Sequence, residues 1–270
     1  MIRWRCALAV TAVLSIAGVA VAAEAPAPAA PAEPLIRQAS ARAAAGDAPG
    51  AGKLYAEALR LDPTSTAAMA GRAELLYAAR KYLAAADEYS RALAVDPRFV
   101  RAWVGRAVAR LGDEDYKRAL EDFDMALAVE PGSALALDAR ADFYRSVRRN
   151  DLALADYDAA LAKAPDNLVM RYNRAMVLVD LGRHDRAIRD LNMILRRSAG
   201  DRDALVLKGE AYAGLGDHAR ALDYYDAVVA MDPNFARALK LRSLARAALG
   251  DAAGAEANAT AAQRPDPASR

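Results

Sequence analysis

The stretch Ala85–Pro97, with the sequence A-A-D-E-Y-S-R-A-L-A-V-D-P, decides the fold because it returns along the chain at a fixed interval. It reappears as A-L-E-D-F-D-M-A-L-A-V-E-P at Ala119–Pro131 and as A-L-A-D-Y-D-A-A-L-A-K-A-P at Ala153–Pro165. The prolines that close successive copies stand 34 residues apart. The chain is therefore organised as a tandem repeat with a period of 34 residues.

Counting the proline as repeat position 32 gives seven repeats that start at residues 32, 66, 100, 134, 168, 202 and 236. Position 20 is alanine in every repeat, and position 8 is small in every repeat. Position 24 is mostly aromatic: it is Tyr55, Tyr89, Phe123, Tyr157, Leu191, Tyr225 and Ala259. A column that is always small and a column that is mostly bulky indicate two helices that approach closely and a large side chain that fills the space beside them.

Positions 20, 24, 27 and 28 follow the i, i+4, i+7, i+8 spacing of one helix face. The proline at position 32 ends that helix, since it lacks an N–H and disfavours helix at the residue before it. Short turns such as Leu181-Gly182-Arg183 separate the two helices of a repeat, with glycine as the C-terminal cap. The sequence thus predicts one pair of antiparallel helices in each repeat.

These columns resemble those of the tetratricopeptide repeat family, and the resemblance covers residues 32–269. It implies an all-α, right-handed α-solenoid of antiparallel helix pairs. Several positions depart from the family pattern. Position 7, usually leucine, is basic in repeats two to seven; Ala199 replaces the proline of repeat five; and Gly112 comes early in repeat three, in what we expect to be a longer G-D-E-D turn.

Residues 1–23 have a different composition. Met1–Arg5 is short and basic, Cys6–Ala23 is apolar without charge, and Ala20–Ala23 offers small-residue cleavage sites. This pattern predicts a secretory signal peptide and an exported, periplasmic protein. The alternative is an uncleaved helix, residues 6–23, that anchors the protein to the inner membrane. The single cysteine, Cys6, lies within this segment, so we expect no disulfide in the mature protein.

The remaining boundaries follow from composition. Residues 24–34 form a linker rich in proline and alanine, where we expect extended structure and no helix. The solenoid should occupy residues 35–264, and residues 265–270 should form a tail. The chain carries 37 basic and 35 acidic residues; without Arg3 and Arg5 the two numbers are equal. A neutral chain without a basic run does not favour nucleic acid as a partner.

No motif for catalysis, cofactor binding or metal binding is found in the sequence. His184 and His218 share repeat position 17, and we expect both to be solvated turn residues, because equivalent positions in neighbouring repeats are too far apart for one zinc ion. Acidic residues recur at position 23 and should form a solvated or ion-paired helix face. The basic side chains at position 7 should cover the helix interface with their stems and keep their charged ends in water.

We therefore expect a non-catalytic scaffold of the bacterial cell envelope, without cofactors, that binds a protein or peptide in its concave groove. The alternatives are an accessory subunit or regulator of an envelope enzyme or assembly complex, and a self-assembling, membrane-anchored scaffold. Contact with a membrane is expected only if the N-terminal helix is retained. The sequence leaves the oligomeric state open.

The family resemblance also implies groove residues, since positions 2, 5, 9, 12 and 13 of each first helix line the concave face in this family. Carried over, they predict a ligand groove made of Glu74, Tyr77, Arg101, Asp138, Asp142, Arg145, Tyr172, Met176, Glu210, Arg237 and Lys240. Some family members clamp the terminal carboxylate of a peptide with lysine and asparagine at positions 5 and 9. Repeats two to four have neither residue at these positions, so the clamp is missing. We expect Asp138, Asp142 and Arg145, with Tyr172 beside them, to contact a ligand that carries basic and apolar groups.

Overall fold

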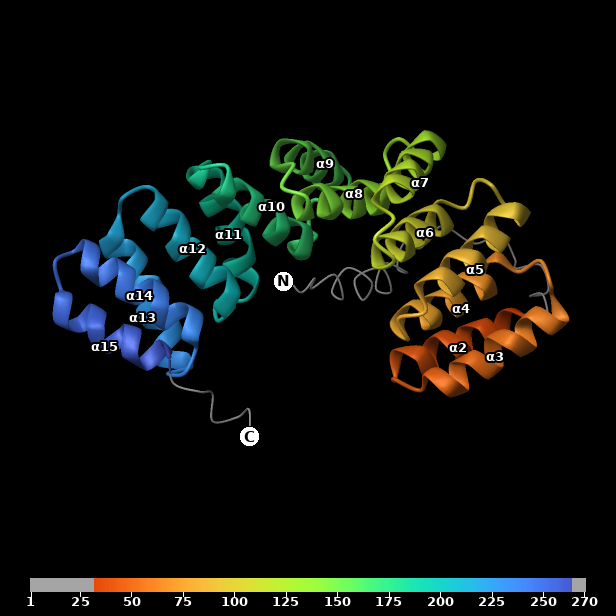
Figure 1. The fold of residues 1–270 in the computed structure, drawn as a ribbon, viewed down its shortest axis with the longest axis horizontal. Helices are drawn as coiled ribbons and strands as arrows, with labels where there is room; N and C mark the ends of the chain where they lie inside the picture. Colours follow the sequence, from red (N-terminus) through yellow and green to blue (C-terminus); the bar gives the residue numbers. More distant parts are fainter. Residues whose placement is uncertain (1–31, 264–270) are drawn as a thin grey trace. The chain divides into compact units, whose positions relative to one another are not determined.

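The computed structural model describes residues 32–263, and these residues form helices joined by short turns (Figure 1). The helices are α2 (Glu33–Ala44), α3 (Ala48–Leu61), α4 (Thr66–Ala78), α5 (Tyr82–Val95), α6 (Val100–Gly112), α7 (Tyr116–Val129), α8 (Ala134–Ser146), α9 (Asn150–Lys163), α10 (Leu168–Asp180), α11 (His184–Arg197), α12 (Arg202–Gly214), α13 (His218–Met231), α14 (Ala236–Ala248) and α15 (Ala252–Ala262). Residues 32–263 contain no strand, which confirms the all-α prediction.

The chain divides into two compact units, of which the first ends at Arg140 and the second begins at Ala141. In the first unit α2 packs on α3, α4 on α5 and α6 on α7. In the second, α10 packs on α11, α12 on α13 and α14 on α15. Each of these pairs consists of two antiparallel helices joined by a tight turn, as Figure 1 shows. The predicted helix pairs are confirmed.

The predicted packing columns form the core. The alanines at position 20 are buried in all seven repeats, and five of the seven small residues at position 8 are fully buried alanines. The side chains at position 24 are buried from Tyr55 to Tyr225. A small residue on each helix lets the two helix backbones come close, and the bulky residue at position 24 fills the space that remains.

The turn inside each repeat has the same backbone in all seven copies, with a positive φ at position 15. Glycine occupies this position in four repeats, and Arg80, Glu114 and Arg148 occupy it in the other three, with φ of 58°, 62° and 61°. The expected longer turn in repeat three was wrong: three residues separate α6 from α7, as in the other repeats, and Glu114 takes the left-handed conformation instead of a glycine. Gly112 is part of α6 and packs against Tyr82.

The expected boundary of the linker at residue 34 was also wrong. Helix α2 begins at Glu33 and has Pro34 in its first turn. A proline is tolerated there because the first N–H groups of a helix have no partner within the helix. The expected signal peptide and tail lie outside the described residues. Between residues 32 and 263, no helix is both long and apolar enough to cross a membrane.

The basic column at position 7 and the acidic column at position 23 meet across the two helices of a repeat. Arg106 donates to both carboxylate oxygens of Asp122 at 3.0 and 2.8 Å, and Arg174 makes the same pair of bonds to Asp190 at 2.8 and 2.6 Å. Both aspartates are buried. The prediction of a solvated acidic face was therefore wrong, and its ion-paired alternative is confirmed.

The charged ends of these arginines do not lie in water, because the same guanidinium also reaches the preceding repeat. The Nη1 atom of Arg174 donates to Asp158 at 2.7 Å, that of Arg242 to Asp226 at 2.9 Å, and that of Arg106 to Ser90 Oγ at 3.0 Å. Each arginine thus ties together three helices from two repeats. Breaking such a partly buried network is costly, because it leaves a charge without its partner.

Candidate functional site

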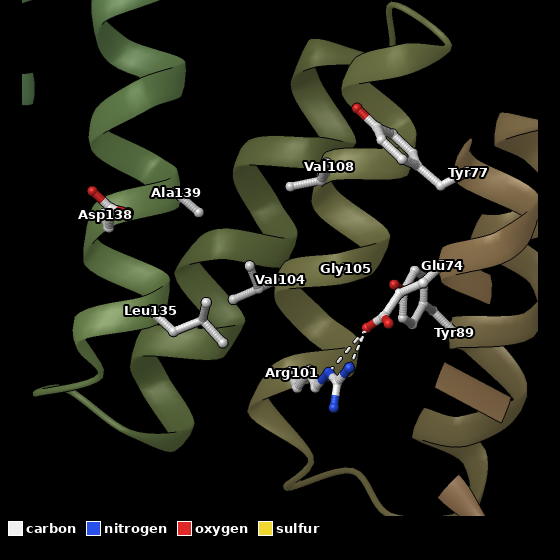
Figure 2. Close-up of a pocket in the computed structure, with 10 residues that line it drawn as sticks. All are labelled: Glu74, Tyr77, Tyr89, Arg101, Val104, Gly105, Val108, Leu135, Asp138 and Ala139. Atoms are coloured by element: carbon white, nitrogen blue, oxygen red, sulfur yellow. Dashed lines mark hydrogen bonds and ion pairs between the residues drawn. The ribbon is translucent and has the colours of Figure 1, made fainter. Parts of the chain in front are cut away.

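A hollow of about 580 Å³, measured with its solvent-open part, lies in the first unit on the face formed by α4, α6 and the start of α8. Figure 2 shows that side chains from these three first helices surround it, together with Tyr89 of α5. Its lining consists of Glu74, Tyr77, Tyr89, Arg101, Val104, Gly105, Val108, Leu135, Asp138 and Ala139. Four of the predicted groove residues are among them: Glu74, Tyr77, Arg101 and Asp138.

The floor of the hollow is apolar. Val104 is buried, and Val108 and Leu135 are half-buried, so their remaining surface faces the open space. Tyr77 stands at one side, with its ring 5.4 Å from the ring of Tyr82. Apolar surface that stays open to water gains free energy when a ligand covers it. The floor can therefore hold aliphatic or aromatic groups.

An ion pair lies at the rim of the hollow. Arg101 Nε and Nη2 donate to the same oxygen of Glu74, at 3.0 and 2.5 Å (Figure 2). Glu74 belongs to repeat two and Arg101 to repeat three, so the pair joins neighbouring repeats. The Glu74 side chain is 15% exposed and the Arg101 side chain is 38% exposed, which places the pair at the edge of the hollow rather than beneath it.

Tyr89 closes the hollow from below. Its ring packs so closely on Gly105 that a Cβ atom added there would overlap the ring. Burial raises the pKa of the Tyr89 hydroxyl, and the negative charge of Glu74 raises it further. The phenol therefore stays protonated at neutral pH and can act as a hydrogen-bond donor.

The side chains at positions 9 and 24 of each repeat form matched pairs. Where position 9 is polar, position 24 is tyrosine; where position 9 is apolar, position 24 is apolar: Ser40/Tyr55, Glu74/Tyr89, Val108/Phe123, Asp142/Tyr157, Met176/Leu191, Glu210/Tyr225 and Leu244/Ala259. Direct hydrogen bonds join Ser40 to Tyr55, at 3.0 Å, and Tyr157 to Asp142. A buried tyrosine hydroxyl needs a hydrogen-bond partner, which explains the matching.

A second hollow, of about 510 Å³ with its solvent-open part, lies in the second unit. Glu210, Ala213, His218, Tyr225, Leu241, Leu244 and Ala245 line it. Arg237 makes a forked ion pair with Glu210, with contacts of 2.9 and 3.1 Å from its Nη2 atom. This pair repeats the Glu74–Arg101 pair four repeats later in the sequence. Burial, and then the charge of Glu210, raise the pKa of Tyr225.

The other predicted groove residues are placed as follows. Asp142 accepts bonds from Tyr157, Asn173 and Arg145 in the second unit. Tyr172 is half-buried, and burial raises its pKa while the charges of Asp203 and Arg237 act on it with opposite signs. Met176 is half-buried and packs against the core of the second unit. Lys240 is exposed.

Reasoning from the sequence missed the apolar floor. Val104 and Val108 occupy positions 5 and 9, and Leu135 occupies position 2, so the rule that selected the charged residues also selects these three. The signal was present, but an apolar residue in an amphipathic helix is first assigned to the core.

The two histidines are not the solvated turn residues that were expected, because both are half-buried. His184 is half-buried against Gly214 at the end of α12, and His218 lines the second hollow. Each is the first residue of its helix, α11 or α13. Within residues 32–263 no group of three or more histidine, cysteine, aspartate or glutamate side chains is arranged to hold a metal ion.

Comparison with known proteins gives the family and the fold. The tetratricopeptide repeat profile matches residues 70–134, 139–202 and 206–270, which is more than half of the chain. Among curated proteins, none matches.

Several solved structures are similar. YrrB, described as a tetratricopeptide repeat protein with an unusual peptide-binding site, is 22% identical, with a TM-score of 0.58, over 68% of this chain and 95% of its own. PilW, a type IV pilus biogenesis factor, is 22% identical, with a TM-score of 0.63, over 72% and 90%. The Pseudomonas aeruginosa protein pilF is 16% identical, with a TM-score of 0.68, over 79% and 97%. At these identities the likeness establishes the fold alone.

Proposed function

The chain belongs to the tetratricopeptide repeat family, and from this premise we propose that it is a non-catalytic scaffold that binds a segment of a partner protein. The binding surface is the hollow on α4, α6 and the start of α8 in the first unit. The bound segment places an apolar side chain over Val104, Val108 and Leu135. The Glu74–Arg101 pair at the rim contacts the backbone or polar groups of the same segment.

The apolar floor is the observation that supports this proposal. Arg101 and Glu74 at the rim already pair with each other, so the rest of the surface offers chiefly apolar area. Such a surface suits a peptide side chain better than a small polar metabolite, because burying a polar group without a partner costs free energy.

We also propose that the protein acts in the bacterial cell envelope. The basic Met1–Arg5 and the apolar Cys6–Ala23 support export. N-terminal sequencing of the protein recovered from cell fractions tests this. We expect a new N-terminus near Ala22 or Ala23 in the periplasmic fraction, whereas an intact Met1 on a membrane-bound protein would favour the anchored alternative.

Photo-crosslinking in living cells tests the binding surface. A photo-reactive amino acid at Val108, in the floor of the hollow, should capture a partner. The control is the same group at Met125, which is exposed on helix α7 and does not line the hollow. Capture from Met125 but not from Val108 would contradict the proposal.

The substitution Leu135→Glu, made together with the photo-reactive group at Val108, sharpens the experiment. A carboxylate placed in the apolar floor should abolish capture, because binding would then bury an unpaired charge. Leu135 is only half-buried, so the fold should persist, which thermal melting checks. Mass spectrometry of the captured species also distinguishes the alternatives: a subunit of an envelope complex would indicate an accessory role, and a second copy of this chain would indicate self-assembly.

A further inference from the structure

Three of the seven repeats carry a carboxylate at position 9, and these are Glu74, Asp142 and Glu210. Two of the three pair with an arginine at position 2 of the following repeat. Arg101 donates twice to Glu74, and Arg237 makes a forked pair with Glu210. At Asp142 the equivalent position holds Val169, whose side chain cannot pair with a carboxylate.

Asp142 is held firmly by other groups. Its Oδ1 atom accepts from the Tyr157 hydroxyl, from Asn173 Nδ2 at 3.3 Å and from Arg145 Nη2 at 3.5 Å. Every one of these bonds goes to the same oxygen. No hydrogen bond to the Oδ2 atom is found among the described residues, and the side chain is 21% exposed. A fixed carboxylate therefore keeps one oxygen available to solvent.

Arg145 forms an ion pair with Asp142, but the distance between the two charged groups is longer than in the Arg101–Glu74 and Arg237–Glu210 pairs. Its only contact with Asp142 is at 3.5 Å, against 2.5 Å for Arg101 with Glu74 and 2.9 Å for Arg237 with Glu210. Arg145 also belongs to the same helix as Asp142, one turn further on, so it approaches from α8 and not from the side of the next repeat. The side of the next repeat is formed by α10, where Val169 is 53% exposed.

We propose that an arginine of a bound polypeptide segment occupies, at Asp142, the place that Arg101 and Arg237 occupy at Glu74 and Glu210. Its guanidinium donates to Asp142 Oδ2, and its alkyl stem packs on the exposed Val169. This proposal rests on the proposed function, since it names one side chain of a partner segment that the protein binds. The chain itself provides two examples of the contact, in which a forked guanidinium meets a carboxylate at the same repeat positions.

Arginine fits this place better than lysine. A planar guanidinium can donate from two nitrogens in a fixed geometry, and it is desolvated more readily than an ammonium group. The positive charge of Arg145 repels the guanidinium of the bound segment. We therefore expect this contact to make a larger interface selective for arginine and not to supply most of the binding free energy. The remaining polar neighbours, Tyr157 and Asn173, are neutral at pH 7 and direct their donors to Oδ1.

Binding of two matched peptide mixtures to the full chain tests the proposal. One mixture of capped octapeptides has a fixed arginine among randomised uncharged residues, and the other has citrulline in its place. Citrulline keeps the shape of arginine and removes its charge. We expect the arginine mixture to bind roughly tenfold more tightly, as one added hydrogen bond to a charged group allows.

The substitution Val169→Arg provides the structural test. It installs the missing intramolecular arginine at a position that α6 and α14 already fill with Arg101 and Arg237, so the variant should fold. We expect it to abolish the preference for arginine over citrulline. Val169→Gln, of similar length but neutral, is the matched control and should retain the preference.

Equal binding of the two mixtures to the unaltered protein would overturn the proposal, and so would equal effects of Val169→Arg and Val169→Gln. The absence of binding by either mixture would overturn it as well. None of these results depends on the first unit, where crosslinking from Val108 tests the proposed function separately. Capture from Val108 without an arginine preference would refute this inference and leave the proposed function in place.

Discussion

The two hollows, one in each unit, share a polar frame and differ in the shape of their floors. Each has a glutamate at position 9, a tyrosine at position 24 and an arginine at position 2 of the next repeat. At position 6 of the next repeat, however, the first unit has Gly105 and the second has Leu241. The ring of Tyr89 packs on Gly105, whereas the ring of Tyr225 packs on Gly209, at position 8 of its own repeat.

In each unit one glycine makes space for the tyrosine ring, and the two units have this glycine in different repeats. In the first unit the glycine lies in the following repeat, which leaves Val104 and Val108 to form the floor. In the second unit it lies in the same repeat, and Leu241 and Leu244 line the hollow. The hydrogen-bonding frame therefore does not determine which ligand side chain fits, because the floor beside it can be rebuilt.

The largest effect should come from giving the first unit the position-6 residue of the second unit. Gly105→Leu places a large side chain where Tyr89 packs, so we expect a loss of roughly 1–3 kcal/mol of unfolding free energy, near the upper end. Denaturant unfolding measures this. Adding Ala73→Gly, the equivalent of Gly209, should recover part of the loss, because the ring then gains space on the other side.

Gly52→Ala in α3 is the control for helical glycines. The nearest atom to an added Cβ is Leu75 Cδ1 at 3.9 Å, so nothing clashes. Removing the flexibility of glycine should stabilise the protein by about 0.5–1 kcal/mol. If Gly52→Ala and Gly105→Leu both stabilised, the close packing of Tyr89 on Gly105 would be refuted.

The helix-contact columns should respond alike in the two units. Ala119 in the first unit and Ala153 in the second are fully buried, and replacing either by leucine should cost roughly 1–3 kcal/mol by overpacking. Ala128, exposed on α7, is the control, and its replacement by leucine should change stability little. Equal melting shifts for all three variants would show that the repeat register is wrong.

Tyr89 and Tyr225 should ionise at a higher pH than a tyrosine exposed to water. The pKa of Tyr89 and that of Tyr225 are both raised by burial, so neither ionises in the folded protein until well above pH 10. The unfolded chain ionises near pH 10. The stabilisation from each tyrosine is therefore fully present below pH 10 and is lost as the pH rises above it.

Tyr89→Phe and Tyr225→Phe measure these two contributions. Each variant should lose less stability between pH 10 and pH 12 than the unaltered protein, as recorded by unfolding at several pH values. Absorbance of tyrosinate near 295 nm gives an independent readout. Ionisation of all tyrosines near pH 10 in the native protein would contradict the burial of the two rings.

The turns should give the smallest effects. Arg80, Glu114 and Arg148 adopt a positive φ that Gly182, Gly216 and Gly250 adopt in the later repeats. Each replacement by glycine removes a left-handed strain of about 1–2 kcal/mol but makes the unfolded chain more flexible, so we expect a net gain of about 0.5–1 kcal/mol. A loss of stability from all three replacements would show that side chains in these turns contribute more than the strain costs.

Local chemistry, copied seven times, made the fold predictable. The closing proline and the small residues at positions 8 and 20 act within one helix pair, and Ala119 and Ala153 are buried as their column requires. Predictions that depended on a single copy were less reliable. Gly112 was assigned to a long turn, but it packs against Tyr82, because a neighbouring side chain and not the turn requires a glycine there.

The candidate site was predicted in part. The family positions selected Glu74, Tyr77, Arg101 and Asp138, which line one hollow. They did not show that Arg101 pairs with Glu74, because these residues lie 27 positions apart and meet only when neighbouring repeats stack. For the same reason the basic position-7 side chains were expected in water, although Arg106 and Arg174 pair with buried aspartates of the neighbouring helix.

The sequence by itself determined the helix pairs, the repeat register and four of the residues that line the first hollow, since each follows from spacing along one helix or from a column repeated in every copy. It also contained the matched pairs at positions 9 and 24, which the contacts of Tyr55 with Ser40 and of Tyr157 with Asp142 explain. Tertiary structure alone decided which charges pair with one another, where a tyrosine ring finds space, and that the hydrogen bonds to Asp142 all go to its Oδ1 atom. These outcomes depend on distances between neighbouring repeats, and such distances are set by the packing of whole helices and not by the local sequence.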